Sequence, residues 1–176
     1  MRQAAKVKVE VVRGDITAEQ VDVIVNAANS ALRRGAGVCG AIFNAAGPEL
    51  DAACAAIGGC ATGDAVITPG FALTARWIIH TVGPVWAGGD RGEPALLASC
   101  YRRSIELARA VGATSIAFPA ISTGIYGYPR QAAAEIAVTT TLATATKHAQ
   151  PLEIVRFVAF DEPTLHAYEA LLDSRR

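Results

Sequence analysis

The loop from Asn26 to Gly40 carries residue types that suit a phosphate ligand. It contains the hexapeptide GAGVCG at positions 35–40. Its glycines let the backbone approach a ligand closely. A helix is expected from about Val38, and it would direct its free N–H groups and its positive dipole end at this loop. The pattern therefore predicts an anion-binding loop.

A second loop of the same kind reads AISTGIYGYP at positions 120–129. It follows an expected strand and precedes a helix expected near Pro129, so its successive N–H groups can form a concave anion site. The residues that would form it are Ser122, Thr123, Gly124, Ile125 and Tyr126. Two such loops favour a diphosphate gripped from both sides, with the Tyr126 ring against a sugar. The alternative is that the glycines only turn the chain from strand to helix.

The hexapeptide also has the spelling G-x-G-x-x-G of a dinucleotide-binding fingerprint. That fingerprint follows its strand directly, and an acidic residue about 20 positions later ends the next strand. Here eight residues, 27–34, separate the expected strand from the glycines, and Asp64 precedes a strand. A nicotinamide dehydrogenase is therefore the least favoured reading.

Alternating strands and helices must position these loops. Strands are expected at 7–12, 21–26, 65–68, 76–82, 115–120 and 154–160. Helices are expected as a pair between 38 and 57 broken at Gly47-Pro48, then from Pro94 to Gly112, from near Pro129, and after the N-cap Asp161. The threonines at 139–141 are weak helix formers and leave the end of the fourth helix open. This order predicts a single α/β domain over residues 1–176, with helices on both faces of a sheet and ligands at the strands' carboxyl ends.

The amino-acid composition limits the kinds of partner that the protein can bind. The 176 residues are 52% hydrophobic, and 16 basic residues balance 16 acidic ones. This balance argues against broad binding to a nucleic-acid backbone, although Arg33-Arg34 and Arg102-Arg103 are candidate local patches or solvated surface. No apolar run of about 18 residues predicts a membrane span. The four cysteines have no C-x-x-C spacing and, with three scattered histidines, make no recognisable metal site. No cofactor is expected. We predict a cytoplasmic monomer.

Three stretches resemble the macrodomain family. They are residues 14–42, which contain NAAN, 78–84, which read IIHTVGP, and 118–129, which contain ISTGIYG. The ending at 158–172 is also similar, so the resemblance covers the chain from about Val9 to Leu172. It implies a three-layer α/β/α fold with a mixed, roughly six-stranded sheet that binds ADP-ribose. It also implies hydrolysis of ADP-ribose esters, as in the MacroD-type subgroup, which acts on O-acetyl-ADP-ribose or mono-ADP-ribosylated carboxylate side chains.

The resemblance assigns roles along the ligand. Asp15 would accept a hydrogen bond from the adenine amino group, with the Ile16 backbone beside it, because an acceptor-only carboxylate complements an NH₂ group. Phe160 would pack on adenine, or else be an ordinary core residue at a strand end. The Ser122–Tyr126 loop would wrap the diphosphate.

At the other end, Asn29 would hold the distal ribose, since an amide both donates and accepts. Asn26 would pin the loop and belongs to the predicted binding set. His80 is expected to be structural rather than a base. The distal ribose and second phosphate would be lined by Gly35, Ala36, Gly37 and Val38.

The chain departs from the ester-hydrolysing pattern where that subgroup often reads GVDGAIHRAAG. Here Cys39 replaces the aspartate and Phe43 replaces the histidine, which removes an acid–base pair. Cys39 lies near an expected helix start, where thiols can be activated, so it is either a nucleophile or a small residue lining the pocket. Catalytic candidates are Asn29, Cys39 and Tyr126. A reader module that cleaves nothing, and a hydrolase acting on ADP-ribosylated nucleic acid rather than protein, remain alternatives.

Overall fold

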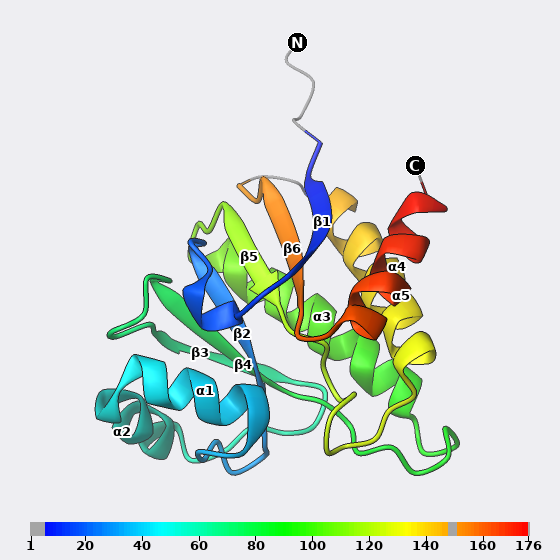
Figure 1. Ribbon diagram of the computed structural model, residues 1–176. Helices are drawn as coiled ribbons and strands as arrows, with labels where there is room; N and C mark the ends of the chain where they lie inside the picture. The colour runs from blue at the N-terminus through cyan, green and yellow to red at the C-terminus, as the bar shows by residue number, and fades with distance from the viewer. Residues whose placement is uncertain (1–5, 148–150, 176) are drawn as a thin grey trace.

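The computed structural model describes residues 6–147 and 151–175, and its centre is one six-stranded sheet (Figure 1). The strand order is β1-β6-β5-β2-β4-β3. Five strands are parallel, and only the edge strand β3 is antiparallel to its neighbour. The strands are β1 (Lys8–Arg13), β2 (Val23–Ala28), β3 (Ala65–Pro69), β4 (Trp77–Val82), β5 (Ser115–Phe118) and β6 (Ile154–Ala159).

Five helices cover the two faces of the sheet, which makes three layers. Figure 1 shows α1 and α2 on one side and α3, α4 and α5 on the other. The helices are α1 (Gly37–Ala46), α2 (Pro48–Ile57), α3 (Glu93–Ala110), α4 (Arg130–Lys147) and α5 (Glu162–Asp173), with a short 3-10 helix over Ile16–Ala18. The expected α/β class, its three layers and its mixed six-stranded sheet are confirmed.

Side-chain alternation along the central strand builds a separate core on each face. Val23 and Val25 of β2 point into the core beneath α3, α4 and α5. Ile24 between them points into the core beneath α1 and α2. All three are fully buried or nearly so, as expected of a parallel strand covered on both faces.

Local signals explain most helix ends. Gly47, at φ 94°, ends α1, and Pro48 begins α2 immediately. The Asp161 carboxylate accepts a hydrogen bond from the Thr164 N–H at 2.9 Å and caps α5. The weak threonines do not end α4, because Thr141 is fully buried within it and tertiary packing outweighs propensity there.

The parallel strands all end at the same edge of the sheet. The loops that follow β1, β2, β4, β5 and β6 therefore gather there, although they are far apart in sequence (Figure 1). Both loops singled out in the sequence are among them. Within the described residues, no helix has the length and apolar character needed to span a bilayer.

Candidate functional site

A cleft of about 800 Å³ opens at this edge of the sheet. The chain after β1, β2, β5 and β6 forms its walls. Apart from Asn26, every residue predicted to bind or react lines this cleft: Asp15, Ile16, Asn29, Gly35, Ala36, Gly37, Val38, Cys39, Ser122, Thr123, Gly124, Ile125, Tyr126 and Phe160. The structure therefore brings together residues that are up to 145 positions apart (15 to 160).

The first loop presents unpaired N–H groups. Ala36 is the N-cap of α1 but makes no side-chain capping bond. Within the described chain, the N–H groups of residues 35–39 donate to no protein acceptor. A Cβ on Gly40 would lie 2.5 Å from the carbonyl oxygen of Gly35, so only glycine lets the helix approach the loop this closely. The result is an uncapped helix start facing the cleft, as an anion requires.

The second loop presents another set of unpaired backbone N–H groups. The five N–H groups of residues 122–126 donate to no acceptor among the described residues. The loop is held by its flanks: the Tyr128 N–H donates to the Ser122 carbonyl at 2.9 Å, and the Trp86 N–H donates to the Tyr126 carbonyl at 2.8 Å. Ser122 itself has φ 69°, a left-handed conformation that non-glycine residues adopt at a cost. Such strain is typical of ligand-binding loops.

Asp15 and Phe160 lie at one end of the cleft. Oδ1 of Asp15 accepts hydrogen bonds from the N–H and the hydroxyl of Thr17, at 2.9 and 2.7 Å. Oδ2 has no donor among the described residues and is free to accept. Phe160 follows the last residue of β6 and is 83% exposed. The alternative that Phe160 is a core residue is therefore wrong, and its ring is available for stacking.

Asn29 follows β2, which is separated from β1 and β6 by β5 in the sheet, and its amide orientation is fixed by the backbone. Its Oδ1 accepts from the Arg33 N–H at 3.0 Å, and its Nδ2 donates to the Arg33 carbonyl at 2.9 Å. Reversing the amide would oppose donor to donor, so the assignment is determined by its partners. One N–H and one oxygen lone pair remain for a ligand.

Asn26 does not line the cleft. It lies in β2 with no exposed surface, and its Nδ2 is 3.0 Å from Nδ1 of the equally buried His80. Direct contact between the Asn26 side chain and a ligand, as its inclusion in the binding set implied, does not agree with this burial. The expectation that Asn26 pins the loop agrees with it, as does a structural role for His80.

Known proteins of one family resemble this chain in sequence and in fold. The Macro domain family model matches residues 25–137. An O-acetyl-ADP-ribose deacetylase from Escherichia coli is 55% identical over 171 residues, covering 95% of this chain and 96% of that protein. This chain belongs to the Macro domain family.

Solved macrodomains share the fold closely. The Oceanobacillus iheyensis macrodomain with ADP superposes with a TM-score of 0.89 at 44% identity, covering 94% of this chain and 90% of that one. The Trypanosoma brucei macrodomain in complex with ADP-ribose gives 0.88 at 41% identity, covering 93% of this chain and 68% of that one. The resemblance seen in the sequence is thereby confirmed.

In the described part of the chain, the cleft wall that follows β2 contains no strong acid or base. Cys39 is 6% exposed, and Phe43 is 1% exposed within the core under α1. The carboxylates that line the cleft, Asp15 and Asp161, follow β1 and β6, whereas Asn29 follows β2. Any chemistry near Asn29 must therefore come from positioning and from groups on the ligand.

Sequence reasoning missed several cleft residues. Among the residues that the structure describes, Arg130 is the only cation lining the cleft, and its Nε donates to the Thr164 hydroxyl at 3.3 Å. Gly83 after β4 lies against Ser122. The proline before Arg130 and the IIHTVGP motif that contains Gly83 could have indicated both positions, because the proline starts a helix and the motif ends a strand at this edge.

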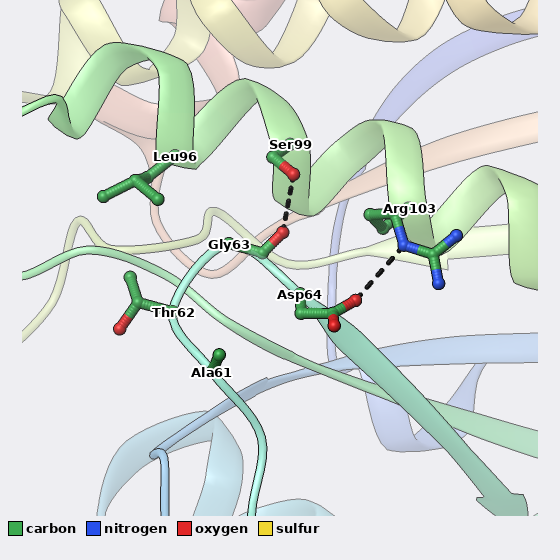
Figure 2. Close-up of a pocket in the computed structure, with 7 residues that line it drawn as sticks. All are labelled: Ala61, Thr62, Gly63, Asp64, Leu96, Ser99 and Arg103. Atoms are coloured by element: carbon green, nitrogen blue, oxygen red, sulfur yellow. Dashed lines mark hydrogen bonds and ion pairs between the residues drawn. The ribbon is translucent and has the colours of Figure 1, made fainter.

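A second hollow of about 360 Å³ lies elsewhere, between α3 and the turn before β3 (Figure 2). Arg103 closes one side of it by pairing with Asp64 at 3.2 Å and with Glu106 at 2.6 Å. Ser99 donates to the Gly63 carbonyl at 2.7 Å on the other side. The side chains of Ser99, Asp64 and Arg103 that line it are already paired with protein groups. Arg103 belongs to solvated surface rather than to an unpaired basic patch.

Proposed function

We propose that this macrodomain binds ADP-ribose and hydrolyses its esters, either O-acetyl-ADP-ribose or ADP-ribose on carboxylate side chains. The observation that carries the proposal is the two sets of unpaired N–H groups, from residues 35–39 and 122–126, that line one cleft. Backbone donors of this kind complement the oxygens of a diphosphate.

The remaining groups suit the two ends of the same ligand. The free Oδ2 of Asp15 and the exposed ring of Phe160 fit an adenine, by hydrogen bonding and stacking. Asn29 offers one donor and one acceptor to the distal ribose. Tyr126, a half-buried residue of the diphosphate loop that lines the cleft, supplies a flat face for that sugar.

In the proposed reaction, a water held between the ligand's phosphate and the ribose ester attacks the acyl carbon. As the acyl–oxygen bond breaks, one proton of the water passes to the ribose oxygen and the other passes to solvent, and a carboxylate and free ADP-ribose leave. No side chain at this end is a strong base, so orientation of the ester and stabilisation of developing charge supply most of the rate. Asn29 orients the sugar, and Cys39 lines its pocket.

A second function is favoured by the residues at positions 39 and 43. A buried thiol and a buried phenyl ring stand where an acid–base pair is common in the ester-hydrolysing subgroup. A reader module that binds ADP-ribosylated partners without cleaving them needs no such pair, and it would use the same cleft.

A product-release assay separates these functions. The protein is incubated with O-acetyl-ADP-ribose and with ester-linked, serine-linked and DNA-linked ADP-ribose, and released ADP-ribose is quantified by chromatography. We expect turnover of the ester substrates and its loss in Asn29→Ala. Tight binding of ADP-ribose with no release from any substrate would establish the reader function, and release from DNA alone would move the substrate to nucleic acid.

A further inference from the structure

A row of polar side chains runs through the apolar layer beneath the first loop. Asn26, His80 and Thr68 are all at most 2% exposed, and their surroundings include Ile24 and Ile78. The parallel register of β2 and β4 places Asn26 beside His80. Buried polar groups destabilise a core unless they are hydrogen-bonded, and of the side-chain polar atoms of these three residues only Oδ1 of Asn26 has no partner among the described residues.

The partners of His80 determine which ring nitrogen carries the proton. The Thr68 hydroxyl donates to the Pro69 carbonyl at 3.2 Å, so it accepts from Nε2 of His80 at 2.9 Å. Nδ1 is then unprotonated and accepts from Nδ2 of Asn26 at 3.0 Å. Burial lowers the pKa of His80 to about 4, so the ring is neutral at neutral pH and Nδ1 stays an acceptor.

The network continues from Asn26 to the cleft. Nδ2 of Asn26 also donates to the Cys39 sulfur at 3.8 Å. The thiol donates in turn to the Arg33 carbonyl at 3.6 Å. That same carbonyl oxygen accepts from Nδ2 of Asn29 at 2.9 Å. A continuous series of hydrogen bonds therefore links a buried imidazole to the amide that faces the ligand.

We propose that Asn26 and His80 are positioning residues that hold Cys39 and, through the Arg33 carbonyl, the Asn29 amide in its ligand-ready orientation. This rests on the proposed function, in which Asn29 orients the distal ribose. His80 acts as a hydrogen-bond acceptor and never as a base. The chain lacks an acid–base pair at positions 39 and 43, and in this proposal the fixed orientation of Asn29 compensates for that lack.

Cys54 provides a matched comparison within the same layer. Its sulfur lies 3.9 Å from Nε2 of His80, on the side away from Asn26, and the residue is 1% exposed. Cys54 therefore contacts the imidazole through its sulfur but does not belong to the series leading to Asn29.

Two conservative replacements test the two sides of the ring. In His80→Asn the amide oxygen takes the place of Nδ1 and keeps an acceptor for Asn26. In His80→Gln the amide nitrogen takes the place of Nε2 and keeps only the bond to Thr68. We expect His80→Asn to retain kcat for O-acetyl-ADP-ribose within about threefold and His80→Gln to lose about tenfold or more, because small misplacements of a reacting group cost that much.

Binding and stability serve as controls. The Kd of ADP-ribose should change by less than about threefold in both variants, because adenine and diphosphate are held by other groups and only orientation is lost. Cys54→Ala should lower Tm and leave kcat unchanged. Equal losses of kcat in His80→Asn and His80→Gln, or a loss in Cys54→Ala as large as in His80→Gln, would overturn the proposal.

Nuclear magnetic resonance supplies a readout that needs neither substrate nor a stable variant. The wild-type His80 ring should show an unprotonated Nδ1, and the Asn29 side-chain amide signal should shift in His80→Gln but not in His80→Asn. A wild-type ring protonated on Nδ1, or an unchanged Asn29 signal, would overturn the positioning role. Absence of turnover in every form of the protein, with these signals as expected, would instead overturn the proposed function alone.

Discussion

Asn29 shows how the first loop prepares a side chain for a sugar. The Asn29 side-chain amide donates one hydrogen bond to the Arg33 backbone and accepts one from it. One donor and one acceptor of the amide remain, in a defined direction. A carboxylate at this position would be repelled by the Arg33 carbonyl, and an alanine would release the loop. The ribose therefore meets a group whose orientation is already fixed before binding.

Cys39→Ser separates the two roles of the thiol. A hydroxyl can donate to the Arg33 carbonyl and accept from Asn26, so a lining and positioning residue tolerates the change, and we expect kcat to stay within about fivefold. A nucleophilic thiol would lose its activity almost completely in the same variant. Initial rates with O-acetyl-ADP-ribose decide between these outcomes, with the Tm of each protein measured in parallel.

The buried imidazole makes stability depend on pH. Burial lowers the folded-state pKa of His80 from 6.5 to about 4. The stability that neutral His80 contributes is therefore fully present above its pKa in the unfolded state. It is lost as the pH falls toward its pKa in the folded state. Between pH 7 and pH 5 this amounts to about 2 kcal/mol of unfolding free energy. Urea unfolding at both values should show this loss in the wild type and a smaller one in His80→Gln; equal losses would contradict it.

At the scale of elements, the two loops depend on close contacts with their neighbours. A Cβ on Gly83, just after β4, would overlap the Ser122 hydroxyl and would lie 2.7 Å from Cγ2 of Ile121. The diphosphate loop can therefore pack here only because position 83 has no side chain.

Gly83→Ala should displace the Ser122 loop and weaken ADP-ribose binding by about tenfold or more, the effect of losing one or two charge-assisted hydrogen bonds. Calorimetry measures the Kd, and circular dichroism confirms that the variant folds. Adding Ser122→Gly should recover part of the affinity, because it removes one of the clashing groups and the strained side chain. Unchanged affinity in Gly83→Ala would show that the loop is not held from β4.

The segment between β4 and α3 is organised by one buried carboxylate. Glu93 accepts backbone hydrogen bonds from Ala87 at 2.9 Å, Gly89 at 2.8 Å and Arg91 at 2.6 Å. From this segment the Trp86 N–H reaches the Tyr126 carbonyl, and its ring packs on Tyr128 at 4.6 Å between centroids. Glu93 therefore supports the diphosphate loop from outside the cleft.

The same hydrogen bonds, led by that from Ala87, lower the pKa of Glu93 from 4.5 to about 2. The stability that the Glu93 carboxylate contributes is fully present above its pKa in the unfolded state, and it is lost as the pH falls from there toward 2. Glu93→Gln, with a single acceptor oxygen, should flatten this acid dependence and speed hydrogen exchange at the amides of residues 87, 89 and 91. Exchange rates equal to those of the wild type would contradict the role of the carboxylate.

At the scale of the whole molecule, local signals predicted the elements well. Strand patterns, the Gly47-Pro48 break and the Asp161 cap all act within a few residues, and the strands end within two residues of their predicted limits. The two phosphate loops were recognisable because each follows a strand and precedes a helix.

Other features depend on contacts that no local pattern contains. The pairing of Asn26 with His80 comes from the register of β2 with β4, across 54 positions. Arg130 lines the cleft because α4 and α5 pack against each other there, so that its guanidinium donates a hydrogen bond to the Thr164 hydroxyl. Burial of Phe43 and exposure of Phe160 likewise follow from which helices cover which part of the sheet.

The central claim is that one cleft grips ADP-ribose by backbone amides from two loops. Titration calorimetry with free ADP-ribose tests it most directly. We expect saturable heat with one ligand bound per chain, weakened in Gly83→Ala. Absence of any heat of association at millimolar ligand would contradict it.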